Sequence, residues 1–140
     1  MDKYEAVNKV NSLFVYEYDT VQYNAADYWR VLDVNADKDE GDCEDYALTV
    51  GWLLAGQSRL KFTWMILTRK IKVCFISTSM GGHAVLQYED MLVDNWKREW
   101  TARKTYEEDY AEHEWTYKFF FNPLVVLKKL IQGKFWKKNG

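Results

Sequence analysis

The spacing of apolar residues changes from a helical period to a strand period near residue 71, and this change constrains the fold most strongly. In residues 3–14, apolar side chains recur every three or four positions, as on one face of a helix. Residues 71–80, 83–90 and 91–96 instead alternate as strands do, and the glycine pair at 81–82 is expected to form a turn. Helices followed by consecutive antiparallel strands predict an α+β domain.

Three further segments complete the predicted elements. Residues 43–54 form an apolar helix that stops before Gly56, and Asn122 caps a last helix with Pro123 at its first position. Residues 114–121 alternate as a strand. Residues 58–70 have helical spacing but also the β-branched and aromatic content of a strand, and we favour the helix.

Length and composition predict one ordered domain over residues 1–140, because 48% of the residues are apolar and only one is proline. No stretch is long and apolar enough to cross a bilayer, so no transmembrane segment is expected. The first residues lack the apolar core of a secretory signal, so a cytoplasmic location is expected. The two cysteines are therefore expected to be reduced.

The net charge of −2 is unevenly distributed along the chain. Residues 1–45 carry −8, residues 46–114 are balanced, and residues 115–140 carry +6. The basic C-terminal segment fits contact with a membrane or a nucleic acid. It also fits a terminal helix that packs its apolar face on its own domain. We favour the second interpretation and expect no nucleic-acid partner.

Cys43 is the candidate nucleophile. Asp42 is a good helix N-cap, which places Cys43 in the first turn, where backbone N–H groups and the helix dipole stabilise a thiolate. The same N–H groups suit an oxyanion. A cysteine on an apolar helix face is more often a small buried hydrophobe, so the assignment needs a base nearby. Cys74, inside a predicted strand, is expected to be structural.

His83 is the candidate base, because it opens a strand directly after two glycines, where a backbone can approach a cleft. His113 lies in an acidic stretch and is expected at the surface. The hairpin register then selects an orienting group. A two-residue turn after Tyr88 pairs Val85 with Asp94 and places Asp94 diagonal to His83, about 7–8 Å away. A three-residue turn would present Asn95 there instead.

Three motifs carry a family resemblance: GDCEDYAL at residues 41–48, GGHAVL at 81–86 and LVDNW at 92–96. They resemble the bacterial transglutaminase-like cysteine peptidases. Four upstream features also fit the family: Asn8, Asn11, Asp19 and the DYW of residues 27–29. The resemblance spans about residues 7–96. The resemblance implies a papain-like, transglutaminase-like fold, in which the nucleophile helix packs on an antiparallel sheet between N-terminal helices and a C-terminal helix.

The resemblance implies a Cys43–His83–Asp94 triad that hydrolyses a peptide or other amide through a thioester. The backbone of Cys43 and the side chain of Trp29 would support the oxyanion. A protein or peptide would be the substrate, and the chemistry would need no cofactor. Two alternatives stay open: a transamidase or deamidase with the same triad, and a non-catalytic protein-binding module. The short chain is similar to phage-encoded members, which implies action in a host cytoplasm.

Acidic residues crowd Cys43, and an anion near 4 Å opposes a thiolate by about 1 to 4 kcal/mol. An imidazolium at His83, the helix dipole or a bound calcium ion would offset this charge. Five oxygen-bearing side chains recur with the spacing of a calcium loop: Asp33, Asn35, Asp37, Asp39 and Glu44. Lys38 stands where such a loop needs glycine, so an EF-hand is not expected. The resemblance implies Asp42 and Glu44 as calcium ligands instead. A solvated loop, with Asp42 only a cap, is the alternative. Asp45 is expected to be a buried structural carboxylate that holds loop backbone or the DYW segment.

Overall fold

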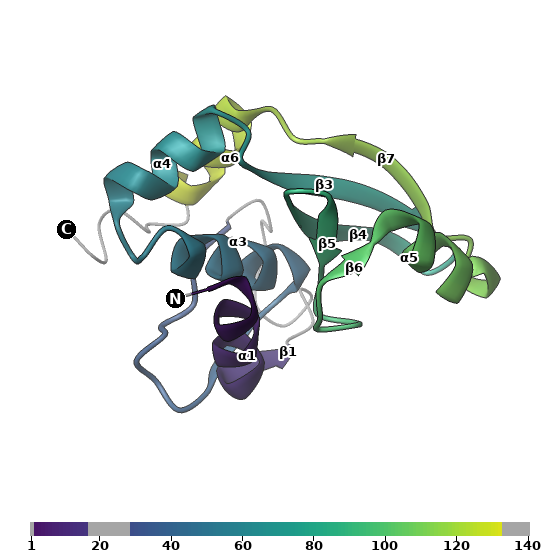
Figure 1. The fold of residues 1–140 in the computed structure, drawn as a ribbon, viewed down its shortest axis with the longest axis horizontal. Coiled ribbons are helices and arrows are strands. Elements are labelled where there is room, and N and C mark those ends of the chain that lie inside the picture. The colour runs from purple at the N-terminus through teal and green to yellow at the C-terminus, as the bar shows by residue number, and fades with distance from the viewer. Residues whose placement is uncertain (1, 17–28, 133–140) are drawn as a thin grey trace.

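The structure is a computed structural model, and it describes residues 2–16 and 29–132 (Figure 1). It has the predicted α+β class, with helices packed on an antiparallel sheet. The elements in chain order are α1 (Lys3–Leu13), β1 (Phe14–Tyr16), β2 (Asp39–Gly41), α3 (Cys43–Leu54), α4 (Arg59–Leu67), β3 (Ile71–Thr78), β4 (Gly81–Tyr88), β5 (Met91–Val93), β6 (Thr101–Ala102), α5 (Arg103–Asp109), a 3-10 turn (Ala111–His113), β7 (Thr116–Phe120) and α6 (Pro123–Gln132).

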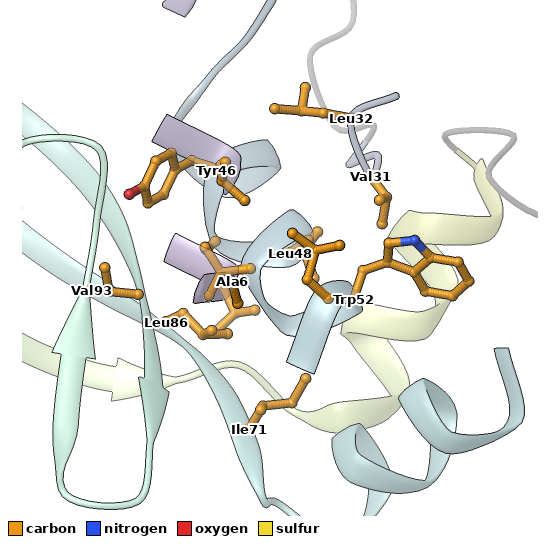
Figure 2. Packing of buried hydrophobic residues seen from close by; sticks show 14 of the residues in the cluster. Ala6, Val31, Leu32, Tyr46, Leu48, Trp52, Ile71, Leu86 and Val93 are labelled. Atoms are coloured by element: carbon orange, nitrogen blue, oxygen red, sulfur yellow. The ribbon is translucent and has the colours of Figure 1, made fainter. Parts of the chain in front are cut away.

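Helix α3 lies at the centre of the molecule and is buried on every side rather than along one stripe (Figures 1 and 2). It contacts α1 on one side and strand β4 on another. Figure 2 shows Leu48 and Trp52 of α3 among side chains from α1 and the sheet, including Ala6 and Leu86. A helix that is apolar on all sides is stable when it is buried in this way. The partly exposed residues of α3 therefore lie at its two ends.

The five-stranded sheet has the order β6-β5-β4-β3-β7, and every neighbouring pair is antiparallel. Strands β4 and β5 are joined by the two-residue turn that the sequence predicts, with Tyr88 opposite Met91. Glu89, in that turn, has φ 57°, a left-handed conformation common in tight hairpins. The register that brings Asp94 to the face of His83 is therefore confirmed.

The predicted turn at Gly81 and Gly82 is wrong, because β4 already begins at Gly81, which pairs with Thr78. The turn falls two residues earlier, at residues 79–80. Gly82 is needed for a close approach instead: a Cβ there would lie 2.7 Å from the ring of Phe75 on the neighbouring strand. Gly82 thus marks tight strand packing, whereas Gly81, with φ 114° and open space around it, supplies a backbone conformation beside the turn that side chains disfavour.

Helix α5 and the segment after it cover the other face of the sheet. A second cluster of buried side chains forms there, and its members are Cys74, Ile76, Val85, Leu92, Tyr106 and Trp115. Cys74 is fully buried, and burial raises the pKa of its thiol to about 11. Its predicted structural role is confirmed.

Helix α6 packs against α4 at the end of the molecule far from α5 (Figure 1). Asn122 caps it, accepting a hydrogen bond from the backbone N–H of Leu124 at 2.8 Å. Val126 and Leu130 are buried, so the helix packs on its own domain as expected. Within the described residues, no helix has the length and apolar character needed to span a bilayer.

The favoured helix over residues 58–70 is confirmed as α4, and its two faces give a stability test. Phe62 is fully buried, whereas Trp64 is 62% exposed. Phe62→Ala should lower the free energy of unfolding by about 3–5 kcal/mol through the cavity it leaves. Trp64→Ala should cost less than about 1 kcal/mol. Denaturant unfolding of both variants measures this, and similar losses would contradict the orientation of the helix.

Candidate active site

Cys43 is the first residue of α3, and a carboxylate pair fixes this helix end. Asp42 caps the helix, accepting from the backbone N–H of Asp45 at 3.1 Å. Asp45 is fully buried and accepts from the N–H of Arg30 at 3.0 Å and of Asp42 at 3.3 Å, so it holds loop backbone as expected. Burial, and then the charge of Asp42, raise the pKa of Asp45 well above its usual range. Cys43 itself is partly exposed.

The structure brings His83 and Asp94 together, as the hairpin register predicts. Nε2 of His83 lies 2.7 Å from Oδ2 of Asp94, and both side chains are buried. The other oxygen, Oδ1, accepts from the hydroxyl of Tyr106 at 2.9 Å and from the backbone N–H groups of Trp96 and Lys97 at 3.1 and 2.9 Å. Such a carboxylate has hydrogen-bond donors on both oxygens and is fixed in position.

Two aromatic residues that the sequence analysis did not single out complete the support of His83. The ring of Trp96 stacks on the imidazole with centroids 3.9 Å apart and an interplanar angle of 12°. Tyr106 is fully buried beneath Asp94, and burial raises the pKa of its hydroxyl far above the usual range, so it stays a donor. The imidazole is therefore held at one edge by a hydrogen bond and on one face by a ring.

Cys43 lies against the strand that carries His83. The backbone N–H of Ala84, the next residue in β4, points to the sulfur and lowers the pKa of the thiol. Burial and the charge of Glu44 have the larger, opposite effect, so the pKa of Cys43 is raised well above its usual value. The thiol donates a hydrogen bond to Oε2 of Glu44 at 3.3 Å. The sequence predicted a stabilised thiolate, whereas the surroundings of the sulfur in the structure raise the pKa of the thiol and so favour its protonated form.

Within residues 2–16 and 29–132, the ring and hydrogen-bond contacts of Trp29 are with Phe121 and Lys129 rather than with the first turn of α3. Its ring packs edge-to-face on Phe121 with centroids 5.0 Å apart, and its backbone N–H donates to the carbonyl of Lys129 at 3.4 Å. These contacts tie the loop before β2 to the C-terminal part of the chain, which is a packing role. The contribution of Trp29 to an oxyanion site stays a prediction, and Asp27 and Tyr28 lie outside the described residues.

The described residues contain no group of three or more His, Cys, Asp or Glu side chains arranged to hold a metal ion. Asp39, part of the calcium-like spacing, instead accepts two hydrogen bonds from the guanidinium of Arg30, at 2.9 and 3.1 Å. Asp42 caps α3 and Glu44 accepts from the thiol. Calcium at Asp42 and Glu44 stays a prediction, with two carboxylates to support it.

His113 is the second histidine, and it lies on the surface as expected. Its side chain is 38% exposed and lies 3.7 Å from the carboxylate of the neighbouring Glu112. Nothing at this position resembles the enclosed setting of His83, so His113 serves as a matched control for it.

Comparison with known proteins supports the fold. The structure is similar to two solved structures of Legionella pneumophila LapG, a transglutaminase-like cysteine peptidase, one of them from EGTA-treated protein. The TM-scores are 0.56 and 0.55 at 16% sequence identity, over 86% of this chain and 61% and 63% of those chains. This chain thus spans less than two thirds of the LapG chains. No family model and no curated protein matches. The fold is therefore transglutaminase-like.

The contact between the thiol and Glu44 gives a test by chemical labelling. Glu44→Gln removes a negative charge next to the sulfur and keeps an acceptor, so the pKa of Cys43 should fall and its iodoacetamide labelling at pH 8 should rise about tenfold. Glu40→Gln, an exposed neighbour without contact to the thiol, is the control. Equal rates in both variants would show that Glu44 does not hold the thiol proton.

Proposed function

We propose that this protein is a thiol hydrolase, a cysteine peptidase or amidase that uses Cys43, His83 and Asp94. The observation that carries the proposal is the buried 2.7 Å contact between His83 and Asp94, on the strand against which Cys43 lies. An orienting carboxylate on one imidazole nitrogen leaves the other, Nδ1, to serve a nucleophile. The similarity to LapG in fold supports a peptidase-like enzyme acting on protein.

The reaction would be acyl transfer. The sulfur of Cys43 attacks the carbonyl carbon of an amide while Nδ1 of His83 takes the thiol proton, and the C–N bond then breaks as His83 gives that proton to the leaving amine. Water attacks the resulting thioester, gives its proton to His83, and the carboxylic acid leaves as the thiol re-forms. Asp94 stabilises the imidazolium in both steps, and the N–H of Cys43 is aimed at the oxyanion.

The raised pKa of the thiol determines the order of events. Because Glu44 and burial keep Cys43 neutral, the proton moves to His83 during the attack rather than before it. The same triad supports transamidation or deamidation if an amine replaces water or if a glutamine side chain is the substrate, and both stay alternatives, as does a binding module that keeps the fold.

The first test of this function compares the two histidines. A peptide vinyl sulfone probe should label Cys43 rapidly in the parent protein, and His83→Ala should slow labelling about 10²- to 10⁴-fold because the base is lost. His113→Ala should leave the rate unchanged. Intact-mass spectrometry with peptide mapping gives the rate and the site. Equal labelling in the two variants, with both folded by circular dichroism, contradicts the proposal.

The second test concerns the support of the imidazole. Asp94→Asn presents an amide to Nε2 and favours the wrong tautomer, so hydrolysis of labelled casein or of a substrate found by peptide screening should fall about 10³- to 10⁴-fold. Tyr106→Phe removes one of several donors and should cost about tenfold. Tyr110→Phe, on the same helix region but without a bond to Asp94, is the control. A Tyr106→Phe rate equal to the control would exclude a positioning role.

A further inference from the structure

Helix α4 exposes a second apolar face that nothing in the described structure covers. Leu60, Trp64 and Leu67 are 84%, 62% and 41% exposed, and they lie at i, i+4 and i+7 along one stripe. Single exposed apolar residues are common on protein surfaces, but a tryptophan between two leucines on one side of a helix forms a contiguous apolar patch. The inner face of the same helix already fills the core, so the outer stripe is not needed for folding.

The neighbouring helix α6 repeats this pattern. Leu124 and Ile131 are 68% and 56% exposed, seven positions apart, and exposed Lys128 lies between them on the same stripe. Because α4 and α6 pack against each other, both stripes belong to one end of the molecule (Figure 1).

Most of the charged side chains at this end are basic. No acidic residue occurs between Asp45 and Glu89 or after Glu114. Exposed Lys61 lies next to the apolar stripe of α4. The basic residues that follow the helix line a hollow of about 320 Å³ together with Gln87, Tyr88 and Glu89; the basic residues are Arg69, Lys70 and Lys72. The carboxylate of Glu89 is paired with Lys3 at 3.1 Å, which leaves the hollow electropositive.

We propose that the α4–α6 end docks on an anionic lipid surface. Trp and Leu side chains that insert at the headgroup level, flanked by Lys and Arg that pair with lipid phosphates, are the combination that interfacial helices use. The hollow beside Arg69 fits a phosphate headgroup. An acidic protein would satisfy the charges, but it gives no reason for three large apolar side chains to stand out from a basic helix.

Docking in this way leaves the candidate active site free. Cys43 stands at the opposite end of α3 from α4, and the twelve residues of α3 span about 18 Å. The bilayer would then hold the thiol at a fixed height, which favours substrates that are themselves at the membrane. The docking does not depend on the thiol chemistry, so the Cys43→Ser variant serves for its test.

The test is vesicle co-sedimentation. Full-length protein should bind vesicles in which phosphatidylglycerol replaces about a third of the phosphatidylcholine, and should not bind phosphatidylcholine alone. Trp64→Ser should weaken binding about tenfold, and Lys61→Gln and Lys70→Gln about fivefold each. A higher salt concentration should weaken the binding of the parent protein to the anionic vesicles.

Met80→Ser is the matched control, because Met80 is 65% exposed but lies at the far end of strand β3. It should bind as the parent does. Circular dichroism shows that each variant is folded. No binding to the anionic vesicles overturns the proposal, whether or not an acidic protein binds instead. Binding that Trp64→Ser and both lysine variants leave unchanged also overturns it, since another surface would then be responsible.

Discussion

The carboxylate of Asp94 is the interaction on which the site depends. It is fully buried, and a buried charge is stable only when donors surround it. Its donors come from different parts of the fold: the strand that carries His83, the backbone just after β5, and Tyr106 of α5. One carboxylate therefore ties the sheet to the helix that covers it, and the same contacts fix the imidazole.

The charges around Cys43 act in the opposite direction. A thiolate at a helix N-terminus would be stabilised by the dipole alone. Here burial and Glu44 outweigh that effect, and the sulfur rests as a donor to the carboxylate. In the proposed chemistry, the imidazole of His83 is therefore held by Asp94 and Trp96, while burial and Glu44 favour the protonated form of the Cys43 thiol.

Much of this arrangement follows from the sequence, for physical reasons. The pairing of Asp94 with His83 could be predicted because side chains alternate along strands and a two-residue turn fixes the register. The cap at Asp42 and the backbone contacts of Asp45 follow from local chemistry. The class of the fold follows from the change in apolar period.

The rest depends on contacts between distant segments. The glycine pair was predicted to form a turn, but Gly82 is required because the ring of Phe75 on the neighbouring strand leaves no room for a side chain. Trp96 and Tyr106 gave no local signal, because their value comes from stacking on His83 and bonding Asp94. The family resemblance implies a role for Trp29 in the site, but its contacts in the structure are those of a packing residue. Compartment, phage origin and calcium binding stay predictions.

The most direct measurement of the central claim is ¹⁵N NMR of the His83 ring. The account predicts that Nε2 carries a proton shared with Asp94, seen as a slowly exchanging downfield signal. It also predicts that Cys43→Ala shifts the resonance of Nδ1, because the proposed reaction needs the thiol to lie next to that nitrogen. A ring whose Nδ1 resonance is the same with and without the sulfur would contradict the account, because the base and the proposed nucleophile would then not meet.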